Sequence, residues 1–494
     1  MMKNVTLVNA PYYLRGRTSF KYIEGYTIPL GIMSIAAVIQ RDHPDVDIRI
    51  IDGMAINLPP GDLLNAILKE SPEIVGIRSF TYNINDALLL AKWIKIRNPD
   101  IKIAIGGVHA TQLPLEVIRN SAVDLVFRGE SEYAFRDFIA GKPYRDIDGL
   151  VYKNPDGTIK MNPNMGLIDD LDDLPMPAYD LVDMKKYFPV AGQCHRFPAS
   201  TVIASRGCPG RCIFCSSSVS GKKIRKRSAE NIFKEMLFLM EHYGVKEIVF
   251  GDDVFTSDKE RVFELCRLIK QNNVDILWDC STRVQFVNEE MLNAMKGAGC
   301  SEISFGVESG DEYILKAIKK GQTLSQVIDK VNMVKKAGLE SKCSFILGFP
   351  QDTMETMQKT IDFAIELDPH IVSFYIACPY PGTVMYDWAA ENDNLLTKNW
   401  SYYDQSHHIM KIPNAASEQI DSMFKKAYAS FYHRPRFILK RLRMIRSLYD
   451  LKNAFKAAWM TLNVHAFPET DFEAVQDRVE GQYMKAEKST GAVH

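Results

Sequence analysis

The sequence predicts a mixed α/β protein in which two successive blocks of alternating strands and helices precede a helical C-terminal region. Its 494 residues exceed the length that one hydrophobic core usually serves, which indicates two or three domains. A hydrophobic fraction of 46% and a charged fraction of 24% are typical of a soluble globular chain. The 60 basic and 61 acidic residues nearly balance, so the overall charge does not favour binding of nucleic acid.

The first block, residues 1–145, contains five short β-rich runs separated by segments with apolar residues at helical spacing. The runs cover residues 5–11, 46–52, 73–79, 102–107 and 124–130. This alternation is typical of a Rossmann-like or flavodoxin-like domain with a parallel sheet. In such domains the ligand lies outside the carboxyl ends of the strands, so the candidate contacts are strand ends.

Residues 146–196 contain several prolines and aspartates without sustained periodicity, which predicts a linker. The second block, residues 197–400, has six further strand-like runs, each followed by a helical segment. These runs cover residues 200–205, 247–253, 276–282, 302–309, 341–350 and 371–382. Six such units predict a partial (β/α)6 barrel with its chemistry at the carboxyl ends of the strands. We expect residues 401–494 to form a helical substrate or lid region.

Three of the nine cysteines, Cys208, Cys212 and Cys215, lie within eight residues, directly after the first strand-like run of the second block. This spacing lets one loop deliver three thiolates to three corners of a four-iron cluster and leaves the fourth iron open. A structural zinc site is an alternative if Cys194 or His195 supplies a fourth ligand, and a chance group of buried thiols is another. The six scattered cysteines are expected to be buried small residues.

The segment SRGCPGRCIFCSS at the end of the first barrel strand resembles the radical S-adenosylmethionine (SAM) superfamily. The resemblance implies a 4Fe–4S cluster whose open iron chelates SAM, and electron transfer that cleaves SAM to a 5′-deoxyadenosyl radical. It also implies that Asp252 and Asp253 lie where the family binds the amino group of SAM, although many members have Gly-Gly-Glu at that place.

Other strand ends of the second block also resemble this family. Glu308 and Ser309, in GVESGDEYILKAIKKGQT, match the segment after the fourth strand and are expected to meet polar groups of SAM. LGFPQDTMET and CPYPGTVMYD match the fifth and sixth segments. Arg283 is a candidate partner for the SAM carboxylate or, alternatively, a surface ion pair. Any single acid among these residues could instead cap a helix.

In the first block, GGVHATQLPLEVI followed by DLVFRGESEYAF resembles the cobalamin-binding domain that precedes the radical SAM barrel in one large subgroup. The candidate cobalamin contacts are Ser79, Gly106, Gly107, His109 and Thr111. His109 could alternatively cap the next helix. The chain lacks an Asp-x-His-x-x-Gly loop in this block, so the resemblance implies base-off cobalamin without a histidine lower ligand.

The resemblance covers about residues 1–400 and implies a cobalamin-dependent radical SAM enzyme that methylates an unactivated carbon of a lipid-like or secondary-metabolite substrate. One alternative is an oxidative cyclase acting on a tetrapyrrole or a lipid. Another is a non-catalytic cobalamin or iron–sulfur sensor. The expected partners are a small-molecule or lipid substrate and an electron donor such as a reductase, a flavodoxin or a ferredoxin.

The sequence favours a cytoplasmic protein, because the longest apolar run, residues 28–39, is too short to span a bilayer and no secretory signal is evident. A basic amphipathic segment, residues 434–448, predicts either peripheral contact with an anionic membrane or a helix packed on the barrel. Its basic residues are Arg434, Arg436, Lys440, Arg441, Arg443 and Arg446, and its apolar stripe is Phe437, Leu442, Ile445 and Leu448.

Overall fold

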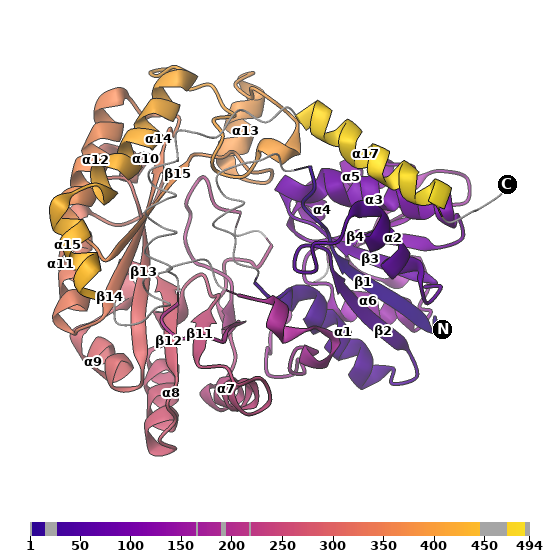
Figure 1. Ribbon diagram of the computed structural model, residues 1–494, viewed down its shortest axis with the longest axis horizontal. Coiled ribbons are helices and arrows are strands. Elements are labelled where there is room, and N and C mark those ends of the chain that lie inside the picture. Colours follow the sequence, from indigo (N-terminus) through magenta and orange to yellow (C-terminus); the bar gives the residue numbers. More distant parts are fainter. Residues whose placement is uncertain are drawn as a thin grey trace.

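The computed structural model describes residues 2–14, 27–164, 166–188, 194–216, 219–444 and 472–489. Two α/β lobes lie side by side, each built around its own sheet (Figure 1). The first lobe contains the N-terminal residues, and the second lobe contains the barrel strands and most of the later helices.

The first sheet has the strand order β2-β1-β3-β4-β5-β6-β7. Its first five strands are parallel: β1 (Asn4–Asn9), β2 (Asp47–Asp52), β3 (Ile74–Arg78), β4 (Lys102–Gly106) and β5 (Leu125–Phe127). The order 2-1-3-4-5 is that of flavodoxin-like doubly wound folds, with a topological switch point between β1 and β3. The Rossmann-like prediction is therefore confirmed.

Helices cover both faces of this sheet, which explains why its strands are continuous apolar runs rather than alternating ones. Leu7 packs on the side of α1 and α6, whereas the next residue, Val8, packs on the side of α2 and α3. The helices are α1 (Leu30–Asp42), α2 (Pro60–Leu68), α3 (Ile84–Arg97), α4 (Val108–Gln112), α5 (Pro114–Arg119) and α6 (Glu132–Ile139).

The segment predicted as a linker contributes two strands to the first sheet, β6 (Leu150–Lys153) and β7 (Ile159–Met161). They form an antiparallel hairpin beside β5. The hairpin turns at Asp156-Gly157, a dipeptide that favours such turns. The rest of the segment crosses to the second lobe, where the Tyr179 hydroxyl donates a hydrogen bond to Glu235 over 2.5 Å.

The second sheet has six parallel strands in the order β15-β14-β13-β12-β11-β8. The strands are β8 (Ala199–Val202), β11 (Glu247–Phe250), β12 (Leu277–Thr282), β13 (Cys300–Glu308), β14 (Glu340–Leu347) and β15 (Ile371–Ile376). Within the described residues, β8 and β15 remain the two edges and do not pair with each other. The predicted partial (β/α)6 barrel is therefore confirmed.

Helices connect successive barrel strands, and most begin on a side chain that caps the first turn, as Ser228 does for α7 and Asp258 for α8. Each cap accepts a hydrogen bond from a backbone amide of the first turn, so the helix begins at a defined residue. The helices are α7 (Ala229–Tyr243), α8 (Lys259–Gln271), α9 (Glu289–Gly297), α10 (Glu312–Ala317), α11 (Leu324–Lys336), α12 (Met354–Leu367) and α13 (Val384–Glu391).

Three C-terminal helices are described, and they divide between the lobes. α14 (Ser417–Tyr432) packs on α12 and β15 of the barrel, and α15 (Pro435–Met444) follows it. α17 (Phe472–Ser489) returns to the first lobe and lies along α2 (Figure 1).

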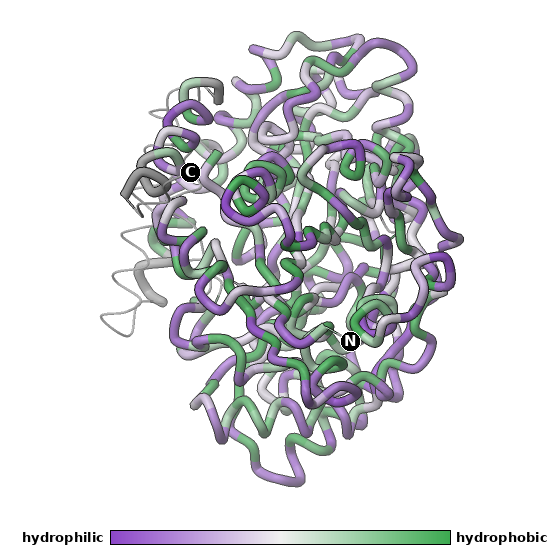
Figure 2. Tube along the Cα trace, turned by 90° about the vertical axis from the view of Figure 1, so that its right-hand side faces the viewer, coloured by the Kyte–Doolittle hydropathy of each residue, from purple (hydrophilic) through white to green (hydrophobic). Residues whose placement is uncertain are grey.

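The predicted membrane-facing segment is only partly described. Phe437 of α15 is buried against Phe431 at a ring-centroid distance of 5.3 Å, whereas Ile438 and Leu439 are exposed. Side chains from Lys440 to Leu448 lie outside the described residues. Hydrophilic residues interrupt the hydrophobic stretches along the described chain, and none of its helices is long and apolar enough to cross a membrane (Figure 2).

Candidate functional site

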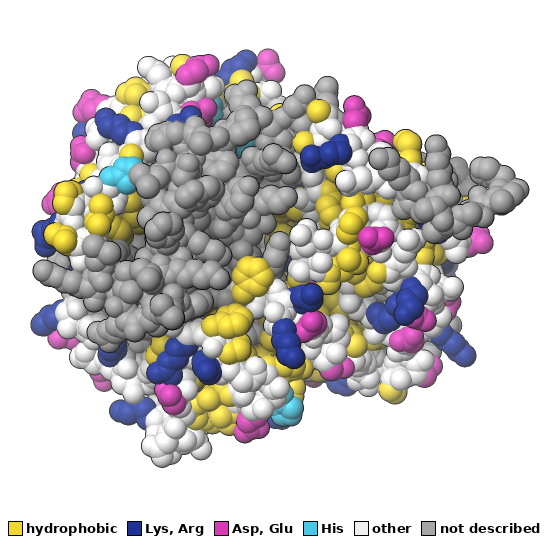
Figure 3. All heavy atoms as spheres, viewed as in Figure 1, with side chains coloured by type: hydrophobic (Ala, Val, Ile, Leu, Met, Phe, Trp, Pro, Cys, Tyr) yellow, Lys and Arg dark blue, Asp and Glu magenta, His cyan; other side chains and the backbone are white. Residues whose placement is uncertain are grey.

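A cavity of about 540 Å³ lies between the lobes, at the carboxyl ends of strands from both sheets. On the face seen in Figure 3, hydrophobic side chains gather where the lobes meet. The strands that reach the cavity are parallel within each sheet, so their carboxyl ends lie together. Each sheet therefore forms one wall of the cavity. The lining includes Arg78, Gly106 and Gly129 from the first lobe and Ser205, Arg206 and Asp253 from the second.

Three predicted residues of the first lobe meet at one turn, where β4 ends. Gly107 has a φ of 104°, and a Cβ at this position would overlap the carbonyl oxygen of Ser79. Only glycine fits this close approach without strain. Gly106 and Gly107 line the cavity, while Ser79 is buried and its hydroxyl has no hydrogen-bond partner within the described structure.

Thr111 and His109 lie on α4, directly after Gly107, and their side chains make contacts within the protein. The Thr111 hydroxyl donates to the carbonyl of Gly107 over 2.8 Å and accepts from the amide of Gly129 over 2.9 Å. His109 is fully buried and does not line the cavity. It packs edge-on against Trp400, with ring centroids 5.0 Å apart, and its Nε2 is 3.8 Å from Glu116. His109 thus lies where the first lobe contacts the segment around Trp400, which follows the barrel strands.

The three clustered cysteines lie between two short strands that pair as an antiparallel ribbon, and residues 207–216 and 219–224 of this connection are described. The ribbon pairs β9 (Ser205–Arg206) with β10 (Arg225–Lys226). Within the loop, the Cys208 amide donates to Gly221 over 3.2 Å, and the Cys215 amide donates to Cys212 over 3.3 Å. We refer to residues 207–224 as the cysteine loop.

The cysteine thiols are mutual neighbours and lie beside charged groups. Desolvation, followed by the charges of Asp253, Cys212 and Cys208, raises the pKa of the Cys215 thiol to about 12. The guanidinium of Arg283 is 3.7 Å from the Cys212 sulfur. A Cβ on Gly210 would overlap this guanidinium. A guanidinium at this distance lowers the cost of thiolate charge. Arg283 also donates to the carbonyl of Lys320.

The donor set of the cysteine loop suits a multi-iron cluster. Its three thiols are neighbours on one loop, and a cubane takes one thiolate at each of three corners. Cys194 and His195, the candidate fourth zinc ligands, lie near Glu247 at the amino-terminal end of β11, whereas the three clustered cysteines follow the carboxyl end of β8. The six scattered cysteines are buried, as expected.

Asp252 and Asp253 follow β11, but their side chains have different surroundings. Asp252 is buried and accepts hydrogen bonds from the Ala204 amide, over 2.9 Å, and from the Ser205 hydroxyl. Burial raises its pKa to about 6 despite these bonds. Asp253 is exposed in the cavity, where desolvation raises its pKa. Asp253 is therefore the one placed to meet a ligand.

Glu308 ends β13 in a conformation that is uncommon for a residue with a side chain. Its φ is 73°, and the pairing of β13 with β14 shifts register there. Such strain at a strand end often marks a functional residue. The buried carboxylate of Glu308 pairs with Lys320 over 2.7 Å, and a side chain on Gly306 would overlap both groups. Ser309 instead contacts Thr360 and the Asp311 amide, at the start of α10.

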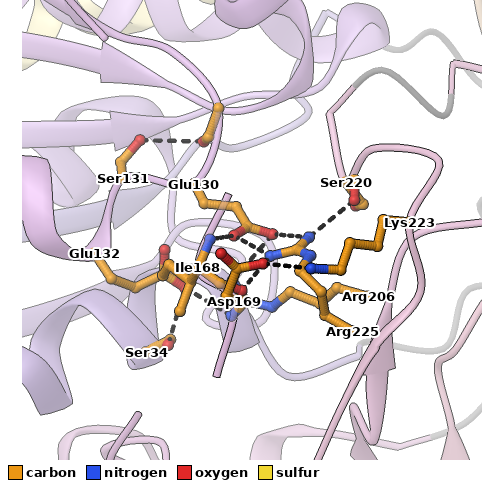
Figure 4. A network of polar contacts seen from close by, with 11 residues as sticks. Ser34, Glu130, Ser131, Glu132, Ile168, Asp169, Arg206, Ser220, Lys223 and Arg225 are labelled. Atoms are coloured by element: carbon orange, nitrogen blue, oxygen red, sulfur yellow. Dashed lines mark hydrogen bonds and ion pairs between the residues drawn. The ribbon is translucent and has the colours of Figure 1, made fainter. Parts of the chain in front are cut away.

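A group of ion pairs that no sequence pattern indicated joins the lobes beside the cavity (Figure 4). Glu130, in the loop after β5, pairs with Arg225, and Glu132, the first residue of α6, pairs with Arg206 at the neck of the cysteine loop. Burial opposes ionisation of Glu130, but Arg225 and Arg206 hold its pKa below its usual range. Glu130 and Glu132 lie in the motif RGESE, Arg225 lies in the basic run KKIRKR and Arg206 lies in SRGC, but none of these motifs identifies its partner.

Comparisons with known proteins agree with both lobes. The B12 binding domain matches residues 17–139, and the radical SAM superfamily matches residues 202–364. The chain is 41% identical to an uncharacterized methyltransferase of Pyrococcus horikoshii over 83% of this chain and 89% of that one. It is 28% identical to the cytidylyl-2-hydroxyethylphosphonate methyltransferase of Streptomyces wedmorensis, over 72% and 77% of the respective chains.

Other similarities concern cyclases and solved folds. Anaerobic magnesium-protoporphyrin IX monomethyl ester cyclases from three organisms are 24% to 26% identical to this chain. The cobalamin-dependent S-adenosylmethionine radical enzyme OxsB, solved with aqua-cobalamin bound, has the same fold with a TM-score of 0.73 and 17% identity. That similarity covers 97% of this chain and 75% of OxsB. The chain belongs to the radical SAM superfamily, in the group whose members carry an N-terminal B12-binding domain and include methyltransferases.

Proposed function

We propose that this protein is a cobalamin-dependent radical SAM methyltransferase that methylates an unactivated carbon of a lipid-like or secondary-metabolite substrate. The observation that carries the proposal is the cavity between the carboxyl ends of both sheets, with the cysteine loop on its barrel side. A reaction that joins a corrin, SAM and a substrate carbon needs all three gathered in one place with little water.

The cysteine loop would hold the cluster through Cys208, Cys212 and Cys215. Arg283, beside Cys212, would offset the negative charge of the thiolates. When bound, the cluster supplies the electron that cleaves SAM, and cobalamin supplies a carrier for the methyl group. The exposed Asp253 carboxylate would accept hydrogen bonds from the SAM ammonium group.

Further contacts follow from the remaining polar groups near the strand ends. Glu308, held by Lys320, would accept hydrogen bonds from SAM, and the strained backbone aims this carboxylate before any ligand arrives. On the other side, Gly106 and Gly107 leave room for backbone to approach cobalamin closely. His109 of this lobe is buried away from the cavity wall, and we propose base-off cobalamin without a histidine lower ligand.

Methyl transfer is tested by accurate-mass spectrometry of lipid and pigment extracts from cells with and without this gene, grown on methionine that carries a deuterated methyl group. We expect a gene-dependent metabolite that retains the intact labelled methyl, and its mass also identifies the substrate class. A product without label that differs from its precursor only by lost hydrogens would overturn methylation. It would favour an oxidative cyclase instead, an alternative suggested by the cyclases similar to this chain.

The cluster is tested by replacing Cys208, Cys212 and Cys215 with alanine one at a time. After anaerobic reconstitution, we expect the unmodified chain to hold one four-iron cluster and each variant to lose most of its iron and its ability to cleave SAM, because one ligand is missing. Cys266→Ala, on the buried face of α8, is the control and should keep both. SAM cleavage retained by the Cys212→Ala variant would contradict the proposed site.

The same variant separates an enzyme from a non-catalytic cobalamin or iron–sulfur sensor. A sensor that needs only its fold would still support the biological process with Cys212→Ala, whereas an enzyme would not. We further propose that a reductase, flavodoxin or ferredoxin delivers the electron, and that the protein acts in the cytoplasm. Contact of α15 with a membrane surface remains part of this proposal, because Ile438 and Leu439 are exposed.

A further inference from the structure

The neck of the cysteine loop is held by residues of the other lobe. Arg206 and Arg225 are directly paired across the β9–β10 ribbon, so they mark the two ends of the loop. Both side chains extend toward the segment Gly129–Glu132 after β5 (Figure 4). The loop that carries the cysteines therefore begins and ends at contacts with the B12-binding lobe.

The contacts are two short charge pairs, and Arg206 also lies 3.4 Å from Glu130. Arg225 binds Glu130 through both terminal nitrogens, over 2.6 and 2.7 Å, and Arg206 binds Glu132 over 2.7 Å. The Ser34 hydroxyl of α1 also donates to Glu132 over 3.1 Å. Two-point pairing of a guanidinium with a carboxylate fixes relative orientation as well as distance.

Solvent has little access to these pairs. The side chains of Arg225 and Glu130 are 1% and 6% exposed, and those of Arg206 and Glu132 are 20% and 6% exposed. Replacing one member by a neutral residue would leave a charge buried with fewer partners, which is costly. The pairs therefore fix the relative orientation of the two lobes at this point.

Three of these side chains, Glu130, Glu132 and Arg206, line the cavity, and the pairs belong to a chain of hydrogen-bonded and covalently linked groups. Thr111 links the carbonyl of Gly107 to the amide of Gly129, next to Glu130. Beyond the Glu130–Arg225 pair, Arg225 donates to the carbonyl of Ser220, within the cysteine loop, over 2.8 Å. Bonded groups thus run from the glycine turn in the cavity to the loop that carries the cysteines.

We propose that the Glu130–Arg225 and Glu132–Arg206 pairs hold the cysteine loop in register with the B12-binding lobe, so that cobalamin in the cavity and a cluster on the loop stabilise one another. This inference rests on the proposed function, because it concerns its two cofactors. The four side chains are positioning residues, since they act through the loop. By reciprocity, the cluster must tighten cobalamin binding by the factor by which cobalamin stabilises the cluster.

The test measures the dissociation constant of hydroxocobalamin for the full chain, once with the cluster reconstituted and once free of iron. We expect the unmodified chain to bind at least about fivefold more tightly with the cluster present. In Glu130→Gln this ratio should fall to about one, because the neutral amide accepts from Arg225 through one oxygen and loses the charged two-point pairing. The ratio is the readout because Glu130 also lines the cavity, and a direct contact with cobalamin would affect both forms equally.

A reciprocal readout is the rate at which a chelator removes iron, followed by elemental mass spectrometry with and without hydroxocobalamin. Cobalamin should slow the loss at least about fivefold in the unmodified chain and have no effect in Glu130→Gln. If Glu130→Gln does not fold, Arg225→Lys keeps the charge but loses the two-point pairing, and its ratio should lie between one and that of the unmodified chain.

The control is Asp368→Asn, which removes another ion pair. Asp368 pairs with Arg434 over 2.8 Å beside α12 and α14, and we expect this variant to keep the full ratio. An unmodified chain that binds no cobalamin or no iron would overturn the proposed function together with this inference. If both bind but the ratio is near one, or if Glu130→Gln leaves it unchanged, the coupling alone is overturned.

Discussion

Two adjacent aspartates show how the surroundings of a single residue decide its role. Asp252 is buried and bonded to the backbone that leads into β9, whereas Asp253 lies one residue further and faces the cavity. The first therefore positions the start of the cysteine loop, whereas the carboxylate of the second is exposed in the cavity. Their sequence neighbours give no indication of this difference, because the turn after β11 sets both directions.

The buried Asp252 predicts a pH dependence of stability. Its folded pKa of about 6 exceeds the ordinary value of 3.8, so the folded state binds more protons than the unfolded chain between these values. The contribution of Asp252 is thus greatest below about pH 4 and falls by roughly 3 kcal/mol as the pH rises through about 6. Asp252→Asn should remove this dependence while keeping an acceptor for the Ala204 amide.

The measurement compares the thermal unfolding midpoints of the two proteins from about pH 4 to pH 7. We expect the variant to gain stability relative to the unmodified chain as the pH rises. A difference between the midpoints that does not change with pH would contradict the assignment.

A second prediction concerns the loss of stability when Gly107 gains a side chain. Gly107 and Gly141 both have positive φ, but only at Gly107 would a Cβ overlap neighbouring backbone. Gly141→Ala should cost about 1 kcal/mol of stability, for conformational strain alone. Gly107→Ala should cost several times more and weaken hydroxocobalamin binding, because Ser79 must move. Equal losses of stability in the two variants, measured by denaturant unfolding, would argue against a close approach at this turn.

At the scale of elements, α17 is a C-terminal helix that stabilises the N-terminal lobe. Tyr483 is 1% exposed and stacks on Trp93 of α3, with ring centroids 5.4 Å apart. Tyr483→Ala should therefore lower the unfolding free energy by about 3–5 kcal/mol. The neighbouring Met484 is 49% exposed, so Met484→Ala should cost less than about 0.5 kcal/mol. A comparable loss in both variants, again by denaturant unfolding, would show that α17 is not anchored through Tyr483.

At the scale of the whole molecule, the cavity between the lobes links ligand binding to global stability. A ligand that binds only the folded chain stabilises it in proportion to the logarithm of its concentration over its dissociation constant. Hydroxocobalamin at about 100 times that constant should therefore raise the unfolding free energy by about 2.7 kcal/mol. Thermal unfolding at increasing cobalamin concentration checks this, and a midpoint that does not rise would count against a cobalamin site.

The sequence alone was sufficient to predict the parallel strands β1 to β5, the partial barrel and the place of the cysteine loop, but not the antiparallel hairpin of β6 and β7. The predicted features depend on local patterns. The apolar runs of β1 to β5 reflect burial on both sheet faces, and the spacing of Cys208, Cys212 and Cys215 lies within one loop. Ser79, Gly106 and Gly107 also lie together, as predicted, because the carboxyl ends of neighbouring parallel strands lie side by side.

Only the tertiary structure decided which side chains face the cavity and which hold the fold. The Glu130–Arg225 pair joins residues 95 positions apart, and no local pattern encodes a pairing at that separation. The same holds for His109, which packs on Trp400, and for α17, which returns to α2. The burial and pairing of a charged or aromatic group depend on which distant segments meet around it, so they are determined only when the lobes pack together.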